Sequence, residues 1–124
     1  MTRTQPVQNK CSKEAHKKMV VKSADEVMEL TVKALVNAGA SDENAEEVAE
    51  HLVESNVSGV DTHGVWQLPG YVDQLGQGVI DGRARPAVVA QGPNHVLVTG
   101  NWTFGQVAMN FALARGIELA ANAR

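Results

Sequence analysis

The 124-residue chain has a single cysteine, Cys11, and no long run of apolar residues. A lone cysteine cannot form a disulfide within the chain, which is typical of proteins from a reducing compartment. Without about 20 consecutive apolar residues, no membrane-spanning helix is expected. The N-terminus also lacks the apolar core of a secretory signal. The sequence therefore predicts a cytoplasmic protein with no membrane segment.

Signatures of metal and nucleotide binding are also lacking. The four histidines have neither cysteine partners nor metal-ligand spacing, so we expect no metal site. Gly76-Gln77-Gly78 begins like a dinucleotide fingerprint but lacks the third glycine and follows a predicted helix instead of a strand. Residues 100–105 have the glycine spacing of a P-loop without its Lys-Ser/Thr pair. These motifs therefore identify no cofactor-binding residue.

The charge is distributed unevenly along the chain. Residues 1–22 carry a net charge of +5, whereas the remainder carries −8, and the whole chain carries −3. A basic arm on an acidic body is compatible with nucleic-acid binding, but its composition favours a solvated, disordered extension. Hydrophobic residues make up 44% of the chain, which is enough for the core of one small domain. We therefore place the folded domain in residues 23–124.

Helical periodicity fills the first half of this domain. Ser23 and Glu26 have the spacing of a capping box, and apolar residues follow at helical intervals up to Gly39. Ser41 can cap a second helix, so residues 23–58 indicate a helical hairpin. A third helix is predicted over residues 64–75, with a kink or an early stop at Pro69.

The second half of the domain combines strands with a last helix. Residues 87–90 and 96–99 are predicted strands separated by a glycine-proline turn, which indicates a β-hairpin. A long apolar helix is predicted over residues 104–121, and it should be covered on nearly all sides. The fold class is therefore α+β, a helical region leading into a β-hairpin and a helix of a larger mixed sheet.

Residues 59–71, with the sequence GVDTHGVWQLPGY, carry the main chemical signal. A histidine at a loop-to-helix junction can exchange protons near neutral pH, and helix N-termini favour anions such as carboxylates. His63, Gln67 and Tyr71 are spaced at i, i+4 and i+8, so they share one face if the helix continues past Pro69. The alternative is that Asp61 or Thr62 only caps a helix and that His63 makes a buried polar contact.

The order of three segments resembles that of the malate/L-lactate dehydrogenase family, a family distinct from the Rossmann dehydrogenases. These segments are SNVSGVDTHG at residues 55–64, LPGYV with a later GVI at residues 68–80, and GNWTFGQ at residues 100–106. The family signature is a Gly-x-Asp-Ser-His-Gly stretch followed by an Arg, a Leu-Pro pair and a Tyr. The resemblance covers about residues 23–121.

The resemblance implies an oxidoreductase that interconverts 2-hydroxy and 2-oxo acids with NAD or NADP as a homodimer. It implies proton transfer by His63 and substrate contacts from Thr62 and Tyr71. Thr62 replaces the usual serine and keeps a hydroxyl group, whereas Gln67 stands where many members have arginine. An arginine can form two charged hydrogen bonds to a carboxylate, whereas a glutamine offers only a neutral amide. This difference weakens the expectation that Gln67 binds a carboxylate.

Members of the family are much longer than this chain, so the resemblance implies that the chain is cut short and is inactive alone. The second hypothesis is a non-catalytic helical interaction module derived from the same family. In that case the apolar last helix would be a docking surface for a partner.

Overall fold

A computed structural model describes residues 20–122. The helices are α1 (Ala24–Asn37), α2 (Asp42–Val57), α3 (Leu68–Gly76) and α4 (Gly105–Asn122), and the strands are β1 (Ala87–Gln91) and β2 (Val96–Thr99). Two 3-10 turns, η1 (Asp61–His63) and η2 (Val65–Gln67), connect α2 to α3. The α+β class is thus confirmed. The predicted disordered extension lies almost entirely outside the described residues.

Local capping determines where the first two helices begin. The Ser23 hydroxyl accepts the backbone N–H of Glu26, while the Glu26 carboxylate accepts the backbone N–H of Ser23 at 2.9 Å. The Ser41 hydroxyl accepts the backbone N–H of Asn44 in the same way at the start of α2. Each of these contacts spans only three residues. Helices α1 and α2 form the predicted helical hairpin.

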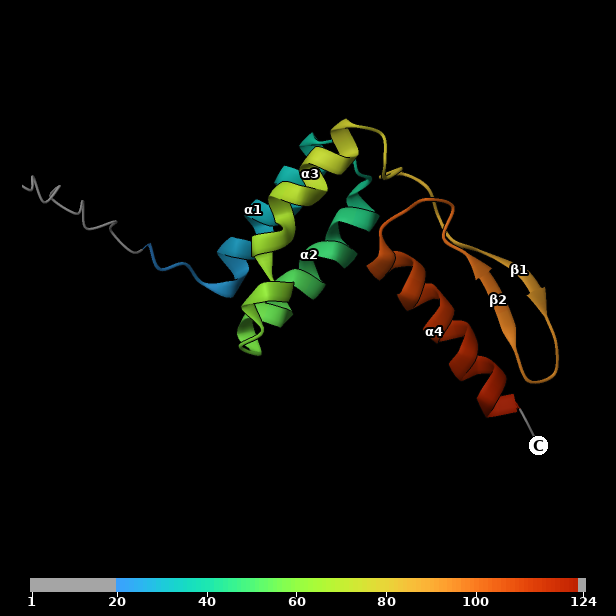
Figure 1. Cartoon of the computed structure of the whole chain (residues 1–124). Coiled ribbons are helices and arrows are strands. Elements are labelled where there is room, and N and C mark those ends of the chain that lie inside the picture. Colours follow the sequence, from blue (N-terminus) through green and yellow to red (C-terminus); the bar gives the residue numbers. More distant parts are fainter. Residues whose placement is uncertain (1–19, 123–124) are drawn as a thin grey trace, which may run out of the picture.

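The core lies where α1, α2 and the first turn of α4 meet. Helix α1 packs against α2 and α3, and α4 packs against α2 and β2. Figure 1 shows the three N-terminal helices grouped together, with α4 and the hairpin beside them. The hydrophobic residues of this core are buried completely or almost completely: Leu35, Ala40, Ala45, Val48, Leu52, Phe104 and Val107.

A buried amide joins α2 to the segment between α3 and β1. The side chain of Asn44 is fully buried and donates to the carbonyl oxygens of Gly82 and Ala84 at 2.9 and 3.1 Å. The Arg85 guanidinium donates to the side-chain Oδ1 of Asn44 and forms an ion pair with Glu47. Burial of a polar amide requires such partners, so these contacts hold the connecting segment against α2.

The hairpin and α4 expose much of their apolar surface. Strands β1 and β2 pair antiparallel with an irregularity between Val88 and Ala90, and every residue of β1 is exposed. On α4 the exposed fractions of Met109, Leu113 and Ile117 are 67%, 59% and 60%. The described residues therefore leave one face of α4 uncovered, and the larger mixed sheet stays a prediction.

Candidate functional site

The loop that carries His63 begins where α2 ends. Gly59 has a φ of +78°, and the N–H of Val60 donates to the Ser55 carbonyl oxygen at 2.8 Å. The N–H of Gly59 donates to the Asn56 carbonyl oxygen at 3.0 Å. These two bonds form a Schellman motif, in which a left-handed residue closes the helix. Glycine adopts this backbone conformation without strain, so the chain turns sharply out of α2 into η1.

The third helix, predicted over residues 64–75 with a kink or an early stop at Pro69, begins later than predicted. Gly64 has an extended backbone, with φ −87° and ψ −156°, and separates η1 from η2. The α-helix begins at Leu68 and places Pro69 in its first turn. A proline is tolerated there because the first N–H groups of a helix have no partner within the helix. Pro69 therefore stands at the start of α3 and does not kink it.

The imidazole of His63 is held at the surface by its neighbour. Its Nδ1 atom lies 3.1 Å from the Thr62 hydroxyl, and the residue is exposed. His63 is therefore not a buried polar contact. The Thr62 hydroxyl can accept from Nδ1–H, and in that tautomer the neutral ring presents an unprotonated Nε2 that can take a proton. Within residues 20–122 no other hydrogen bond reaches the ring, so the exposed residue keeps Nε2 free for a ligand.

The other two predicted site residues lie on different elements from His63. Gln67 ends η2, and its Nε2 donates to the Thr62 carbonyl oxygen at 2.8 Å. Tyr71 lies in α3, where its ring packs edge-on against Phe104 with 5.8 Å between the ring centres. A shared face of His63, Gln67 and Tyr71 was predicted only if one helix carried them, and no helix includes all three. Gln67 instead bonds the loop backbone directly, at Thr62.

Asn56 is a site residue that sequence reasoning missed. Its Nδ2 donates to the Asp61 carboxylate at 2.7 Å, and its Oδ1 accepts the Val65 N–H at 2.8 Å. The sequence places Asn56 in the family-like segment at residues 55–64 but indicates no role for it. A better signal was an asparagine in the last turn of a predicted helix, because its amide can bond nearby backbone groups.

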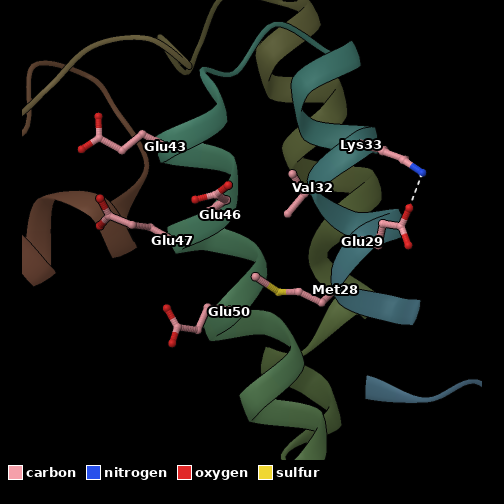
Figure 2. A pocket seen from close by; sticks show the side chains of 8 residues that line it. All are labelled: Met28, Glu29, Val32, Lys33, Glu43, Glu46, Glu47 and Glu50. Carbon is pink, nitrogen blue, oxygen red and sulfur yellow. Dashed lines mark hydrogen bonds and ion pairs between the residues drawn. The ribbon is translucent and has the colours of Figure 1, made fainter. Parts of the chain in front are cut away.

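One hollow of the described residues is lined by no residue of the His63 loop. It has a volume of about 640 Å³ and lies between α1 and α2 (Figure 2). Four glutamates of α2 line it together with Met28, Glu29, Val32 and Lys33 of α1: Glu43, Glu46, Glu47 and Glu50. Lys33 is paired with Glu29, so the walls carry an excess of negative charge. These walls would repel the phosphates of a dinucleotide.

Within residues 20–122, none of the helices combines the length and the apolar character that crossing a membrane requires. No group of three or more His, Cys, Asp or Glu side chains in this part of the chain is arranged to hold a metal ion.

Comparisons with known proteins converge on one family. The family described as malate/L-lactate dehydrogenase matches residues 22–123. The chain is 34% identical over 96 residues to a malate dehydrogenase of Pyrococcus abyssi, which covers 77% of this chain and 26% of that protein. It is 32% identical over 101 residues to a Delta(1)-pyrroline-2-carboxylate/Delta(1)-piperideine-2-carboxylate reductase of Pseudomonas syringae pv. tomato, covering 82% of this chain and 29% of the relative.

Solved structures give the same result. The chain superposes on malate dehydrogenase of Pyrococcus horikoshii OT3 with a TM-score of 0.78 at 29% identity, covering 83% of this chain and 30% of that one. It superposes on the delta1-piperideine-2-carboxylate reductase of Pseudomonas syringae with a TM-score of 0.77 at 30% identity, covering 85% of this chain and 32% of that one. The chain thus spans less than a third of the length of these relatives.

Proposed function

Because this chain belongs to the malate/L-lactate dehydrogenase family, we propose that it is the N-terminal part of an oxidoreductase that interconverts 2-hydroxy acids and 2-oxo acids. The observation that carries the proposal is the exposed His63 ring, whose Nδ1 is occupied by the Thr62 hydroxyl. The matched relatives are named as dehydrogenases and reductases, so a non-catalytic interaction module gains no support from the comparisons.

His63 is the proposed catalytic residue. In the oxidation direction the O–H bond of the substrate breaks, and the proton passes to a ring nitrogen of His63 as the carbonyl forms. In the reduction direction the protonated ring returns that proton to the carbonyl oxygen. A histidine suits both directions because its ordinary pKa lies near neutral pH. The Thr62 hydroxyl on Nδ1 favours the ring orientation in which Nε2 faces the ligand.

Thr62, Gln67 and Tyr71 are the proposed substrate contacts. The Tyr71 hydroxyl accepts a 2.8 Å hydrogen bond from Gln106, so its own proton stays available for a substrate oxygen. Gln67 uses one amide N–H on the Thr62 carbonyl oxygen and keeps a second for a ligand. Because the Gln67 amide is neutral and a guanidinium is charged, carboxylate binding by Gln67 is weaker than binding by an arginine.

NAD or NADP is the proposed cofactor, and it would supply the hydride acceptor or donor. The hollow between α1 and α2 does not fit a dinucleotide, because it is walled by glutamates and lined by no residue of the His63 loop. We therefore assign no cofactor contact to residues 20–122, and the proposed roles there are proton transfer and substrate binding. The whole protein is proposed to be cytoplasmic and to form a homodimer. Size-exclusion chromatography with light scattering would test the homodimer.

The test uses the complete polypeptide that carries this segment. Oxidation of NADH and NADPH is measured with a panel of 2-oxo acids for wild type and for His63→Ala. Loss of a general acid–base group predicts a fall in kcat of about 10²-fold or more. His51→Ala is the matched control, because His51 is an exposed histidine of α2 with no proposed role. Unchanged turnover in His63→Ala would remove His63 from the mechanism.

A further inference from the structure

The amide of Asn56 forms one tether on each side of His63. It donates to the carboxylate of Asp61, two residues before His63, and accepts the backbone N–H of Val65, two residues after it. The tethers measure 2.7 and 2.8 Å, which are short for their types. A single side chain thus fixes the backbone just before and just after the proposed catalytic imidazole.

The helix that carries Asn56 is itself rigidly placed. Asn56 lies in the last turn of α2, whose inner face contributes Val48 and Leu52 to the core. The Schellman motif at Gly59 closes α2 directly after it. Asn56 therefore links the loop to the core, together with the Gln67 bond to Thr62 and the packing of Val65 against the core.

The backbone of the loop passes close to the Asn56 side chain at Gly64. Gly64 is buried, and a Cβ atom placed there would lie 2.1 Å from Asn56 Oδ1. Only glycine permits this approach, since any side chain would displace the amide. Gly64 follows His63 directly, so the position of the imidazole and the position of the Asn56 amide are linked through one peptide.

We infer that Asn56 is a positioning residue that holds His63 at the substrate through its tethers to Asp61 and Val65. The inference rests on the proposed catalytic role of His63. The two partners dictate the chemistry of the side chain: a carboxylate requires a donor, and a backbone N–H requires an acceptor. The Asn56 amide supplies both from one planar group. An aspartate at position 56 would keep the acceptor but would face Asp61 with a second negative charge.

The test exchanges the two partners. Asn56→Asp removes the donor and places two carboxylates together, so kcat should fall about tenfold to hundredfold while KM changes little. The double variant Asn56→Asp with Asp61→Asn restores a donor–acceptor pair in the reverse sense and keeps the Val65 acceptor. Its kcat should return to within about threefold of wild type. Failure of the second substitution to restore kcat would contradict the inference.

A matched control separates positioning from general effects of charge. Asn37→Asp makes the same chemical change at an exposed residue at the end of α1, and its kcat should equal that of wild type. Where Asn56→Asp does not fold, Asp61→Ala carries the test, because it removes one tether without adding a charge. An unchanged kcat in Asp61→Ala would contradict the inference.

A second readout does not depend on turnover. Hydrogen exchange of the Val65 amide is measured by NMR in the 124-residue chain, where Asn56→Asp with Asp61→Asn should retain the protection that Asn56→Ala loses. If His63→Ala leaves turnover unchanged, the proposed function fails although the tether is still seen in the exchange data. If Asn56→Ala loses Val65 protection while kcat stays at the wild-type value, the positioning role fails and the proposed function stands.

Discussion

The side-chain amide of Gln106 in α4 donates a 2.8 Å hydrogen bond to the hydroxyl of Tyr71 in α3, across 35 residues of sequence. The bond is partly buried, and the Tyr71 ring rests edge-on against the fully buried Phe104. It joins the helix that follows the His63 loop to the helix that follows the hairpin. The N-terminal helices and α4 are thus coupled through a residue proposed to contact the substrate.

We expect Tyr71→Phe to lower the free energy of unfolding by about 1 kcal/mol, because one partly buried hydrogen bond is lost while the ring contact with Phe104 remains. Urea denaturation of the 124-residue chain measures this. Gln106→Ala removes the donor from the other side. The costs of the two single variants should not add in the double variant, since both remove the same bond. Additive costs would show that the bond contributes nothing.

Features held by contacts between near neighbours were predictable from the sequence. The capping box of Ser23 and Glu26 and the cap at Ser41 act over three residues, so their residue types alone indicate where α1 and α2 begin. The hairpin was also predicted, because glycine and proline separate two β-prone runs. Strand β1 extends only one residue further than predicted, to Gln91.

Features that depend on distant partners were not predictable. The helical spacing from His63 to Tyr71 suggested one helix, but the amide of Asn56 captures the Val65 N–H across nine residues and favours 3-10 turns in its place. The Gln106 partner of Tyr71 lies too far along the chain for any local pattern to indicate it. The proposed roles of His63, Thr62, Gln67 and Tyr71 still stand as predictions.

Gly64→Ala tests the close contact that shapes the loop. A methyl group at Gly64 would overlap Asn56 Oδ1, so the amide or the loop must shift, at a cost of about 1–3 kcal/mol in the free energy of unfolding. Gly116→Ala in α4 is the control, because no atom lies within 4 Å of a Cβ placed there. In a helix interior this change should stabilise by up to about 1 kcal/mol. Equal effects of both variants on thermal unfolding would contradict the close contact.

The capping box of α1 should make part of the stability depend on pH. The backbone N–H of Ser23 is the main cause that lowers the pKa of Glu26, followed by the side chains of Lys22 and Ser23. A carboxyl group whose pKa is lower in the folded state adds stability above its unfolded pKa, near pH 4, and loses it as the pH falls through the folded value. Glu26→Gln should therefore destabilise the chain at pH 7 and much less at pH 2.

Lys22→Gln separates the two main causes of that shift. It removes the ion pair but keeps the Ser23 backbone N–H, so most of the difference between pH 7 and pH 2 should persist. Thermal denaturation at both pH values measures this for wild type, Glu26→Gln and Lys22→Gln. A Glu26→Gln variant equally destabilised at both pH values would show that the carboxylate charge is not what stabilises α1.

Gln67→Arg tests whether residue 67 contacts the substrate carboxylate. Gln67 is exposed and ends η2, four residues after His63. A charged hydrogen bond exceeds a neutral one by about 1 kcal/mol, so KM for a 2-oxo acid should fall about fivefold in the complete polypeptide with little change in kcat. Gln77→Arg adds the same charge at the end of α3 and should leave KM unchanged. A fall of equal size in both variants would indicate long-range attraction and not a contact, because attraction over a distance is shared by both sites and is screened by salt.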